Sequence, residues 1–401
     1  MSVIRTSALM IVAGERSGDV YGGRLAAALK VHRPGLALFG CGGEALRHGG
    51  VETVADLRQF AMVGITEVVS GLPGAYRAFQ SLVRAAERRR PRLAILIDSP
   101  SLNMRLARRL KRLGIPVLYF VSPQIWAWKK WRLRQLPPLV DRMVCIFDFE
   151  EAIYREAGIP ADYVGHPLVE TVAPRLSRDQ FFARFHLDPN LPTVALLPGS
   201  REIEISYLLP TLLETVRQLS ARQDLQFALA VAPTLDPAHI DAQLQNQPGL
   251  RRALRVVTGA TYDALAHSTV AVVASGTATI EAAILGRPMV VVYRVSPLTA
   301  FFARRMVDVP FFSMVNLLAG KKVVEELIQD DFTAPRLAAA LTGLLDHPEL
   351  QSKMREELCA VKSRLGEAGA IERVADIVLQ MLEAPQEKPG PGSQLIENYR
   401  L

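Results

Sequence analysis

Two stretches of the sequence open a βαβ segment in the same way: Ile11-Val-Ala-Gly-Glu-Arg-Ser-Gly-Asp19 in the first half of the chain and Ala195-Leu-Leu-Pro-Gly-Ser-Arg-Glu202 in the second. In each stretch an apolar run enters a glycine-containing turn, and a segment with helical periodicity follows. A strand, a tight turn and a helix in this order are typical of a sheet of parallel strands. The repeated opening therefore predicts two similar α/β domains.

Short apolar runs continue this alternation through the chain. We expect strands at 7–13, 93–97, 116–121, 142–147, 193–197, 225–231, 254–258, 269–274 and 288–292. Parallel strands of this kind are covered by helices on both faces, and ligands bind at their carboxyl ends. Two such sheets facing each other would place these ends on either side of one central cleft.

A proline-rich segment, 166–192, separates the two halves and is expected to be a linker with a short helix near 177–186. We expect an N-terminal domain over 1–168, a C-terminal domain with helices at its end over 169–384, and a tail over 385–401. Of the 401 residues 49% are hydrophobic, which is ample for two buried cores.

The net charge of +7 is unevenly distributed. Residues 1–165 carry 24 Lys and Arg against 14 Asp and Glu, and the remainder carries 23 against 26. This favours an anionic surface or a phosphorylated ligand for the first half, although charge runs also occur on ordinary solvated helices. We find no nucleic-acid-binding motif and no apolar run long enough to span a membrane. Three widely spaced cysteines predict neither a disulfide framework nor a metal site, and indicate a reducing compartment.

Two loops in the second half have the composition of a nucleotide diphosphate site. Gly199, Ser200 and Arg201 follow a strand and precede a helix, where backbone amides and a guanidinium suit a diphosphate. The second loop contains Ser275, Gly276, Thr277, Ala278 and Thr279, followed by Glu281. An acid at that position suits the hydroxyls of a ribose. An ordinary turn and a capped helix are the alternative interpretations.

Neither a Walker motif nor a G-x-G-x-x-G dinucleotide motif is present, which weakens ATPase and NAD-dependent functions. A metal-dependent transferase would call for an Asp-x-Asp type of site. The nearest candidate, Asp148-Phe-Glu150, is interpreted as the acidic first turn of a helix. We therefore expect no metal and no cofactor.

In the first half Asp98 directly follows an apolar strand, which makes it the candidate general base. The alternative is that it caps the following helix, a role that Ser101 also fits. We assign seven further residues to the acceptor side: Gly14, Glu15, Ser17, Gly18, Asp19, Ser122 and Trp126. The tryptophan stretch could instead be core, and His166 is interpreted as a structural hydrogen-bonding residue.

Taken together, these motifs resemble lipid-A-disaccharide synthase, a family of lipopolysaccharide biosynthesis with the GT-B architecture. The matching stretches are Ala13-Gly-Glu-Arg-Ser-Gly-Asp19, Met62-Val-Gly-Ile-Thr-Glu-Val68, Ile97-Asp-Ser-Pro-Ser-Leu-Asn103, Val121-Ser-Pro-Gln-Ile-Trp-Ala-Trp128, Val164-Gly-His-Pro167, Leu196-Leu-Pro-Gly-Ser-Arg201, Ser275-Gly-Thr-Ala-Thr-Ile-Glu281, Pro288-Met-Val-Val-Val-Tyr-Arg294 and Asn316-Leu-Leu-Ala-Gly320. They occur in order across nearly the whole chain.

The resemblance implies a metal-independent, inverting transfer of 2,3-diacylglucosamine from its UDP donor to 2,3-diacylglucosamine 1-phosphate, with a β-1,6-linked disaccharide 1-phosphate and UDP as products. It implies that Asp98 is the base, that Ser200 and Arg201 meet the diphosphate, and that Glu281 meets the ribose. It adds Asn316 and Gln329 on the nucleotide side. A homodimer is left open.

The sequence departs from the family at two positions. Ser101 replaces a second carboxylate near Asp98, and Arg16 stands where the family has a small residue. Two other functions remain open on the sequence alone. A UDP-sugar epimerase would bind the same nucleotide without a lipid acceptor, and a membrane-surface binding protein would need only the basic first half.

Because the resemblance implies acylated substrates, we also expect a cytoplasmic enzyme that associates peripherally with the anionic inner membrane. The stretch Met62–Phe79 is too poor in charge for a solvated helix and too rich in Gly and Pro for a span. We assign the contact with acyl chains and lipid phosphates to Met62, Val63, Val68, Val69, Leu72, Arg88, Arg89 and Arg90. The alternative is that this stretch packs inside the domain.

Overall fold

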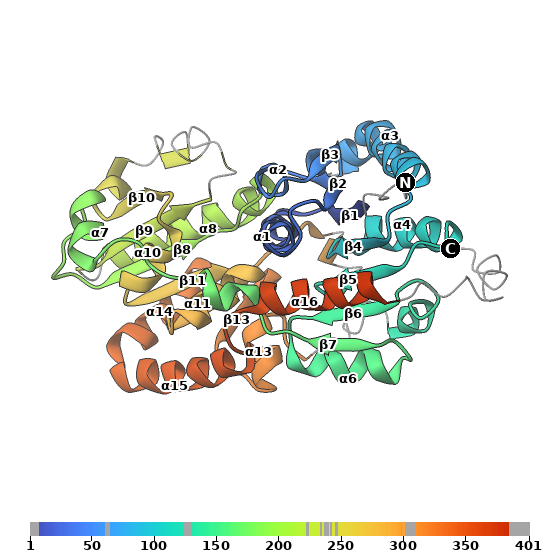
Figure 1. Cartoon of the computed structure of the whole chain (residues 1–401). Coiled ribbons are helices and arrows are strands. Elements are labelled where there is room, and N and C mark those ends of the chain that lie inside the picture. The colour runs from blue at the N-terminus through green and yellow to red at the C-terminus, as the bar shows by residue number, and fades with distance from the viewer. Residues whose placement is uncertain are drawn as a thin grey trace, which may run out of the picture. The chain divides into compact units, whose positions relative to one another are not determined.

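The computed structural model describes residues 8–384 apart from 61–64, 124–129, 222–223, 233–234, 236–239, 241–242, 245–247, 298 and 301–309. The described residues form two compact units. The first contains the chain up to Pro167 together with the residues from Leu365 onward, and the second contains Leu168–Arg364. Each unit is built on one sheet of parallel strands (Figure 1).

The sheet of the first unit has seven strands, all paired in parallel. In spatial order they are β3 (Glu52–Asp56), β2 (Ala37–Gly42), β1 (Ala8–Ala13), β4 (Leu93–Ile97), β5 (Val117–Phe120), β6 (Arg142–Cys145) and β7 (Ala161–Tyr163). The helices of this unit are α1 (Arg16–His32), α2 (Glu44–His48), α3 (Ile65–Arg89), α4 (Pro100–Arg112), α6 (Asp148–Glu156) and α16 (Ala370–Glu383).

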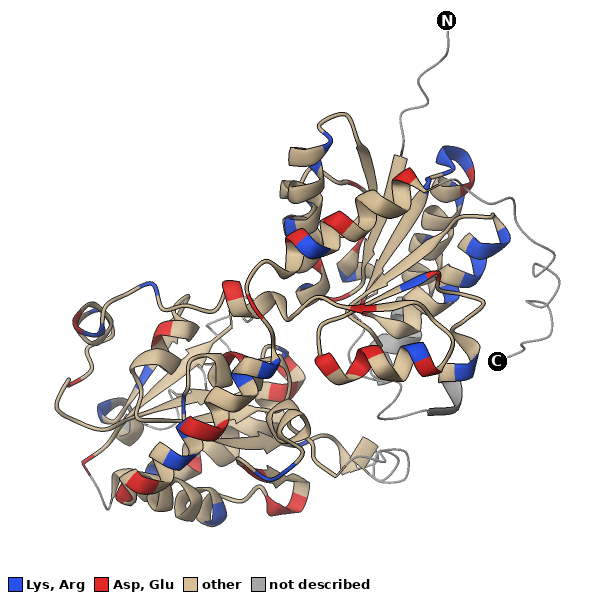
Figure 2. Ribbon diagram, turned by 60° about the horizontal axis from the view of Figure 1, so that its bottom comes forward, with Lys and Arg blue, Asp and Glu red and all other residues tan. Residues whose placement is uncertain are grey.

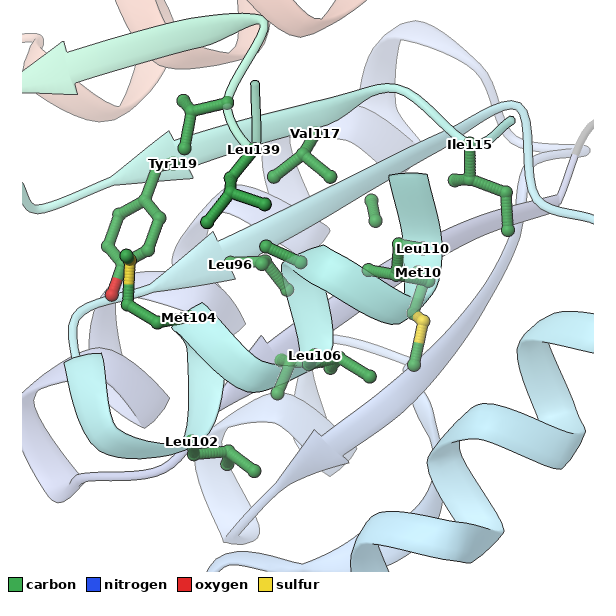
Figure 3. Packing of buried hydrophobic residues seen from close by; sticks show 14 of the residues in the cluster. Met10, Leu96, Leu102, Met104, Leu106, Leu110, Ile115, Val117, Tyr119 and Leu139 are labelled. Atoms are coloured by element: carbon green, nitrogen blue, oxygen red, sulfur yellow. The ribbon is translucent and has the colours of Figure 1, made fainter. Parts of the chain in front are cut away.

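The core of the first unit lies between the sheet and its helices. Figure 3 shows Met10, Leu96 and Val117 from three adjacent strands packing against Leu106 and Leu110 of α4. All five side chains are fully buried. The strands read as continuous apolar runs because both faces of a parallel sheet are covered.

The sheet of the second unit has six parallel strands. In spatial order they are β10 (Leu254–Thr258), β9 (Gln226–Val231), β8 (Thr193–Leu197), β11 (Val270–Ala274), β12 (Met289–Tyr293) and β13 (Glu325–Ile328). The helices are α7 (Arg178–Arg184), α8 (Glu202–Ser220), α10 (Thr261–His267), α11 (Thr277–Ile284), α13 (Met314–Ala319), α14 (Ala334–Asp346) and α15 (Pro348–Arg364).

The strand order reverses direction at β1 in the first sheet and at β8 in the second. In sheets of this type such a switch point opens a crevice at the carboxyl ends of the strands, where ligands bind. In the first unit the loops that flank this point follow β1 and β4, and in the second they follow β8 and β11. The candidate residues Asp98 and Arg201 lie in these loops.

All nine expected strands are present with small shifts at their ends, and four further strands were missed. The missed strands are β2, β3, β7 and β13. Two of them, β7 and β13, have only three and four residues, and β2 contains Gly40 and Gly42, which weaken a strand pattern. Three of the four, β3, β7 and β13, are edge strands, which need less apolar sequence than the centre of a sheet.

The C-terminal helix differs from the expected domain division. We assigned residues up to 384 to the second domain, but α16 belongs to the first unit and packs against α1. It buries Val374 and Val378, and Arg373 Nε donates to the carbonyl oxygen of Val164 at 2.8 Å. The sequence pattern predicted the helix, but it did not show that the helix packs against α1 of the first unit.

Lys and Arg recur on helices of the first unit, where the sequence places its excess of positive charge (Figure 2). Arg105, Arg109 and Arg112 lie exposed along α4. Among the described residues, no helix combines the length and the apolar character that crossing a bilayer requires.

Candidate functional site

Asp98 lies in a strained turn at the carboxyl end of β4. Asp98 and Ser99 have φ angles of 49° and 48°, in the left-handed region that residues other than glycine rarely adopt. The side chain of Asp98 is half-buried. The helix α4 starts at Pro100, and its N-cap is Ser99, not Asp98. The alternative interpretation of Asp98 as the capping residue is therefore wrong.

Two buried polar side chains hold this turn. Tyr119 donates its hydroxyl to the carbonyl oxygen of Asp98 at 2.6 Å, and Asn103 Nδ2 donates to the same oxygen at 2.8 Å. Asn103 also donates to the carbonyl oxygen of Ile97 at 3.0 Å. The backbone amide of Asp98 donates to the carbonyl oxygen of Phe120 at 3.0 Å. Strained backbone persists where its surroundings over-determine it, and it clusters at functional sites.

Asn103 and Tyr119 were missed as functional residues by the sequence analysis. Both side chains are fully buried. Asn103 carries a usable signal, because it is a polar residue on the apolar face of the helix after the candidate base. Tyr119 carries none, because a tyrosine in an apolar strand is ordinary core.

The turn after β1 packs directly onto this site. A Cβ atom on Gly14 would lie 2.3 Å from Ser99 Oγ and 2.9 Å from Ser99 Cβ, so only glycine permits the approach. A Cβ atom on Gly18 would lie 3.3 Å from Ile97 Cγ2. Glu15 is the N-cap of α1, and Glu15 and Ser17 are half-buried. The structure thus brings Gly14 and the first turn of α1 against the residues on either side of Asp98.

Asp19 has a structural role that the sequence analysis did not predict. Its carboxylate is buried and accepts hydrogen bonds from the backbone amides of Gly43, Ala45 and Leu46 at 2.6, 3.1 and 3.2 Å. These amides belong to the start of α2, where they have no partner within the helix. Asp19 therefore anchors α2, and its assignment to the acceptor remains a prediction.

The end of β5 carries a third strained residue. Val121 has a φ angle of 60°, an outlier for a β-branched residue, and Ser122 beside it is buried. Trp126 lies outside the described residues. His166 is buried between the rings of Tyr21 and Phe147, and burial lowers the pKa of its imidazole to about 3. A neutral, enclosed imidazole agrees with the structural role expected for it.

In the second unit the loop after β8 is closed by a carboxylate. Gly199 has a φ angle of 111°, and a Cβ atom there would lie 2.3 Å from Glu204 Oε2. That oxygen accepts hydrogen bonds from the backbone amides of Ser200 and Arg201 at 2.9 and 3.3 Å. Glu204 Oε1 lies 3.4 Å from Arg201 Nη1. We expected these amides to face a diphosphate, but in this structure Glu204 already occupies them.

The loop after β11 divides into exposed and buried positions. Gly276 and Thr277 are exposed, Ala278 is half-buried, and Ser275 donates its hydroxyl to the carbonyl oxygen of Phe312 at 3.1 Å. Thr279 is fully buried and donates its hydroxyl to the carbonyl oxygen of Gly276 at 2.8 Å. Its hydroxyl therefore stabilises the first turn of α11, and the assignment of Thr279 to the donor site stays a prediction.

Glu281 lies one turn further along α11 and is half-buried. Tyr262 donates its hydroxyl to Glu281 Oε1 at 3.1 Å. Burial raises the pKa of Glu281, and the hydrogen bond from Tyr262 acts in the opposite direction. A carboxylate of this kind can accept two hydroxyls when ionised.

Asn316 is buried and uses its whole side-chain amide within the second unit. Its Oδ1 accepts the amides of Val323 and Val324 at 2.7 and 2.9 Å, and its Nδ2 donates to Val324 O and to Glu326 Oε1. Asn316 thus fixes the loop between α13 and β13, and its place on the nucleotide side stays a prediction.

Gln329 follows β13 with a φ angle of 55° and is half-buried. Its Oε1 accepts the amide of Val295 at 3.1 Å, and its carbonyl oxygen accepts from Arg294 Nη2 at 3.3 Å. Gln329 thus joins the ends of β12 and β13, and its contact with the nucleotide stays a prediction.

The residues expected to meet the membrane are only partly described. Met62 and Val63 lie outside the described residues, while Val68, Val69 and Leu72 belong to α3, which continues as one helix to Arg89. The stretch 65–79 is therefore helical despite its glycines and proline.

The arginines at the end of α3 differ from one another. Arg88 is exposed. Arg89 pairs with Glu52, its Nη1 lying 2.8 Å from Oε2, and its guanidinium covers the ring of Phe39 at 4.7 Å. Arg90 donates to the carbonyl oxygen of Leu113 at 3.2 Å. Arg89 and Arg90 thus have partners within the protein, which the sequence analysis did not predict.

Asp148 and Glu150 occupy the first turn of α6, as expected for the Asp-Phe-Glu stretch. Within the part of the chain that the structure describes, no group of three or more His, Cys, Asp or Glu side chains is placed to hold a metal ion.

The two parallel sheets, each with polar loops at its switch point, define a two-domain α/β protein of the GT-B class. Two solved structures show this fold at low identity. The UDP-GlcNAc 2-epimerase from Neisseria meningitidis is 14% identical, covers 93% of this chain and 100% of its own, and has a TM-score of 0.63. A glycosyltransferase from Rickettsia africae is 11% identical, covers 94% and 99%, and has a TM-score of 0.58.

Sequence comparison assigns the family within this class. The family profile described as lipid-A-disaccharide synthetase matches residues 9–378. The lipid-A-disaccharide synthase of Myxococcus xanthus is 45% identical over 375 residues, covering 93% of this chain and 97% of the relative. The chain belongs to the lipid-A-disaccharide synthase family. This decides against an epimerase and against a binding protein without catalysis, and the epimerase likeness concerns the fold alone.

Proposed function

We propose that the chain transfers 2,3-diacylglucosamine from UDP to 2,3-diacylglucosamine 1-phosphate and releases UDP. The observation that carries this proposal is the family match over nearly the whole chain. The geometry of both units supports it, since each has its candidate residues in the loops at the switch point of its sheet.

In this proposal Asp98 is the general base. It removes the proton from the acceptor hydroxyl as that oxygen attacks the anomeric carbon of the donor sugar, and the bond from this carbon to the diphosphate oxygen breaks. Attack from the face opposite the leaving diphosphate inverts the anomeric configuration. A base must be held within hydrogen-bonding reach of its proton, and the bonds from Tyr119 and Asn103 supply that rigidity.

The donor site is assigned to the loops after β8 and β11. Arg201 neutralises the diphosphate without a metal, and Glu281 accepts the ribose hydroxyls. Because Glu204 holds the amides of Ser200 and Arg201, a diphosphate that binds these amides must displace its carboxylate. The side chain of Arg201 is 57% exposed, so it is accessible to an anion.

The nucleotide assignment is tested by measuring UDP, ADP and NAD binding as a shift of the melting temperature. Only UDP should raise it. Arg201→Ala should weaken UDP binding by about 1.5–3 kcal/mol, the range for a hydrogen bond to a charged group. Arg217→Ala, at the other end of α8, is the matched control and should bind UDP normally. Unchanged affinity in Arg201→Ala would place the diphosphate elsewhere.

The reaction itself is tested by the release of UDP with and without the monosaccharide acceptor. Transfer requires that UDP accumulates only when 2,3-diacylglucosamine 1-phosphate is present, together with equal amounts of disaccharide. UDP release that ignores the acceptor would contradict the proposed transfer. Retained turnover after treatment with a chelator would support metal independence.

We also propose that the first unit associates with an anionic membrane surface. Acyl chains remain in the bilayer, because each buried methylene is worth about 0.8 kcal/mol. Exposed cations add on the order of 1 kcal/mol each near such a surface. The pair between Arg89 and Glu52 is no obstacle, since an exposed ion pair contributes only about 0–1 kcal/mol and lipid phosphates can replace it.

Vesicle sedimentation tests this association. Binding should require anionic lipid, fall with salt, and drop when Arg88, Arg89 and Arg90 are changed to Ser. Because Arg89→Ser also removes an internal ion pair, Arg88→Ser is measured alone as well, with Arg184→Ser in α7 as its control. Binding that ignores both salt and these substitutions would refute the proposal.

A further inference from the structure

The carboxylate of Glu281 is not left to rotate, because the neighbouring helix supplies a hydrogen bond to one of its oxygens. Tyr262, in the first turn of α10, donates its hydroxyl to Glu281 Oε1 at 3.1 Å, and both residues are half-buried. Burial and the adjacent carboxylate raise the pKa of Tyr262, so its hydroxyl keeps its proton and acts as the donor.

Tyr262 is itself placed by contacts that do not involve Glu281. Its neighbour Asp263 is buried, and Asp263 Oδ1 accepts the amides of Arg175 and Leu176 at 2.7 and 2.6 Å. At the other end of α10, His267 Nε2 donates to the carbonyl oxygen of Leu176 at 2.8 Å. Both ends of this short helix are thus attached to the same segment before α7, which makes Tyr262 a fixed point against which Glu281 is oriented.

We propose that Tyr262 is a positioning residue for nucleotide recognition: its hydroxyl holds Oε1 of Glu281 and thereby orients the carboxylate toward the two ribose hydroxyls of UDP. The inference rests on the proposed function, because it requires that Glu281 binds the ribose. A carboxylate has two oxygens with about four acceptor positions, so one bond to Tyr262 leaves enough for both hydroxyls. Tyr262 lies 19 residues before Glu281 in the sequence, and no motif around it indicates a role in nucleotide binding.

The test compares UDP with 2′,3′-dideoxy-UDP, which lacks both ribose hydroxyls, by calorimetry on the full chain. Tyr262→Phe should raise the Kd for UDP by about three- to tenfold, the effect of one hydrogen bond. The Kd for the dideoxy compound should not change. Tyr207→Phe, a half-buried tyrosine of α8 in the same unit, is the control and should leave both constants unchanged.

If Tyr262 had a merely structural role, Tyr262→Phe would weaken the binding of both compounds equally, and that result would overturn the inference. So would a further loss of UDP affinity when Tyr262→Phe is added to Glu281→Ala, because without a side-chain acceptor at position 281 the hydroxyl of Tyr262 has nothing to orient.

Glu281→Gln alone separates this inference from the proposed function. If that variant binds UDP like the unchanged protein, the ribose contact itself is wrong and the donor assignment fails with it. If it binds UDP weakly while Tyr262→Phe binds both compounds normally, only the role of Tyr262 is refuted.

Discussion

Gly14→Ala tests whether the contact between the turns after β1 and β4 positions the candidate base. The new Cβ atom would lie 2.3 Å from Ser99 Oγ and 2.9 Å from Ser99 Cβ. The hydroxyl can rotate away, but Cβ is fixed by the backbone, and contacts below 3.0 Å require something to shift. The turn that contains Asp98 must therefore move by several tenths of an ångström.

Overpacking of this kind costs about 1–3 kcal/mol, so the midpoint of urea unfolding should fall. Turnover should fall as well, by up to the about 10²-fold that a displacement of 1 Å at a catalytic group costs. Gly343→Ala is the control. Gly343 lies inside α14, and its added Cβ would meet nothing within 4 Å, so this variant should gain about 1 kcal/mol in helix propensity.

Ser99→Gly provides the rescue. It removes both clashing atoms, and with a φ angle of 48° it also relieves about 1 kcal/mol of left-handed strain. The double variant should therefore recover most of the stability and turnover lost in Gly14→Ala. Normal turnover and an unchanged midpoint in Gly14→Ala, or no recovery in the double variant, would refute this account of the site.

Three further predictions concern single side chains. Asp98→Asn should bind UDP normally and lose about 10²–10⁴-fold in kcat, and near-normal turnover would exclude Asp98 as the base. Because burial raises the pKa of Glu281, its carboxylate takes up a proton at a higher pH than an exposed one. UDP should therefore bind with full affinity above this pKa and more weakly as the pH falls through it. Glu281→Gln should remove this pH dependence. A pH-independent Kd for UDP in the unchanged protein would contradict the prediction. Asp19→Ala should destabilise the first unit by about 3 kcal/mol in urea unfolding, since three amides at the start of α2 lose their acceptor; an unchanged midpoint would contradict this role.

Much of the candidate site was predictable because its signals are local. Glycines after apolar strands mark turns, and Asp98 stands directly after such a strand. Tyr119 was not predicted to act on Asp98, because its hydroxyl donates to a carbonyl oxygen 21 residues away in the sequence. The internal hydrogen bonds of Asn316 and Thr279 were not predicted, because a polar side chain in a motif suits a ligand and a buried backbone group equally well.

The amino-acid sequence alone was sufficient to predict the two α/β units, nine of the strands, the switch-point loops and the family, because apolar periodicity, glycine-containing turns and the order of motifs are local features of the chain. Three features became known from the folded structure: α16 belongs to the first unit and packs against α1, Glu204 accepts hydrogen bonds from the amides of the loop after β8, and Tyr262 donates to Glu281. These contacts depend on strand order and helix packing. Hydrogen-bond partners distant in sequence are chosen by the folded arrangement, and no local pattern encodes them.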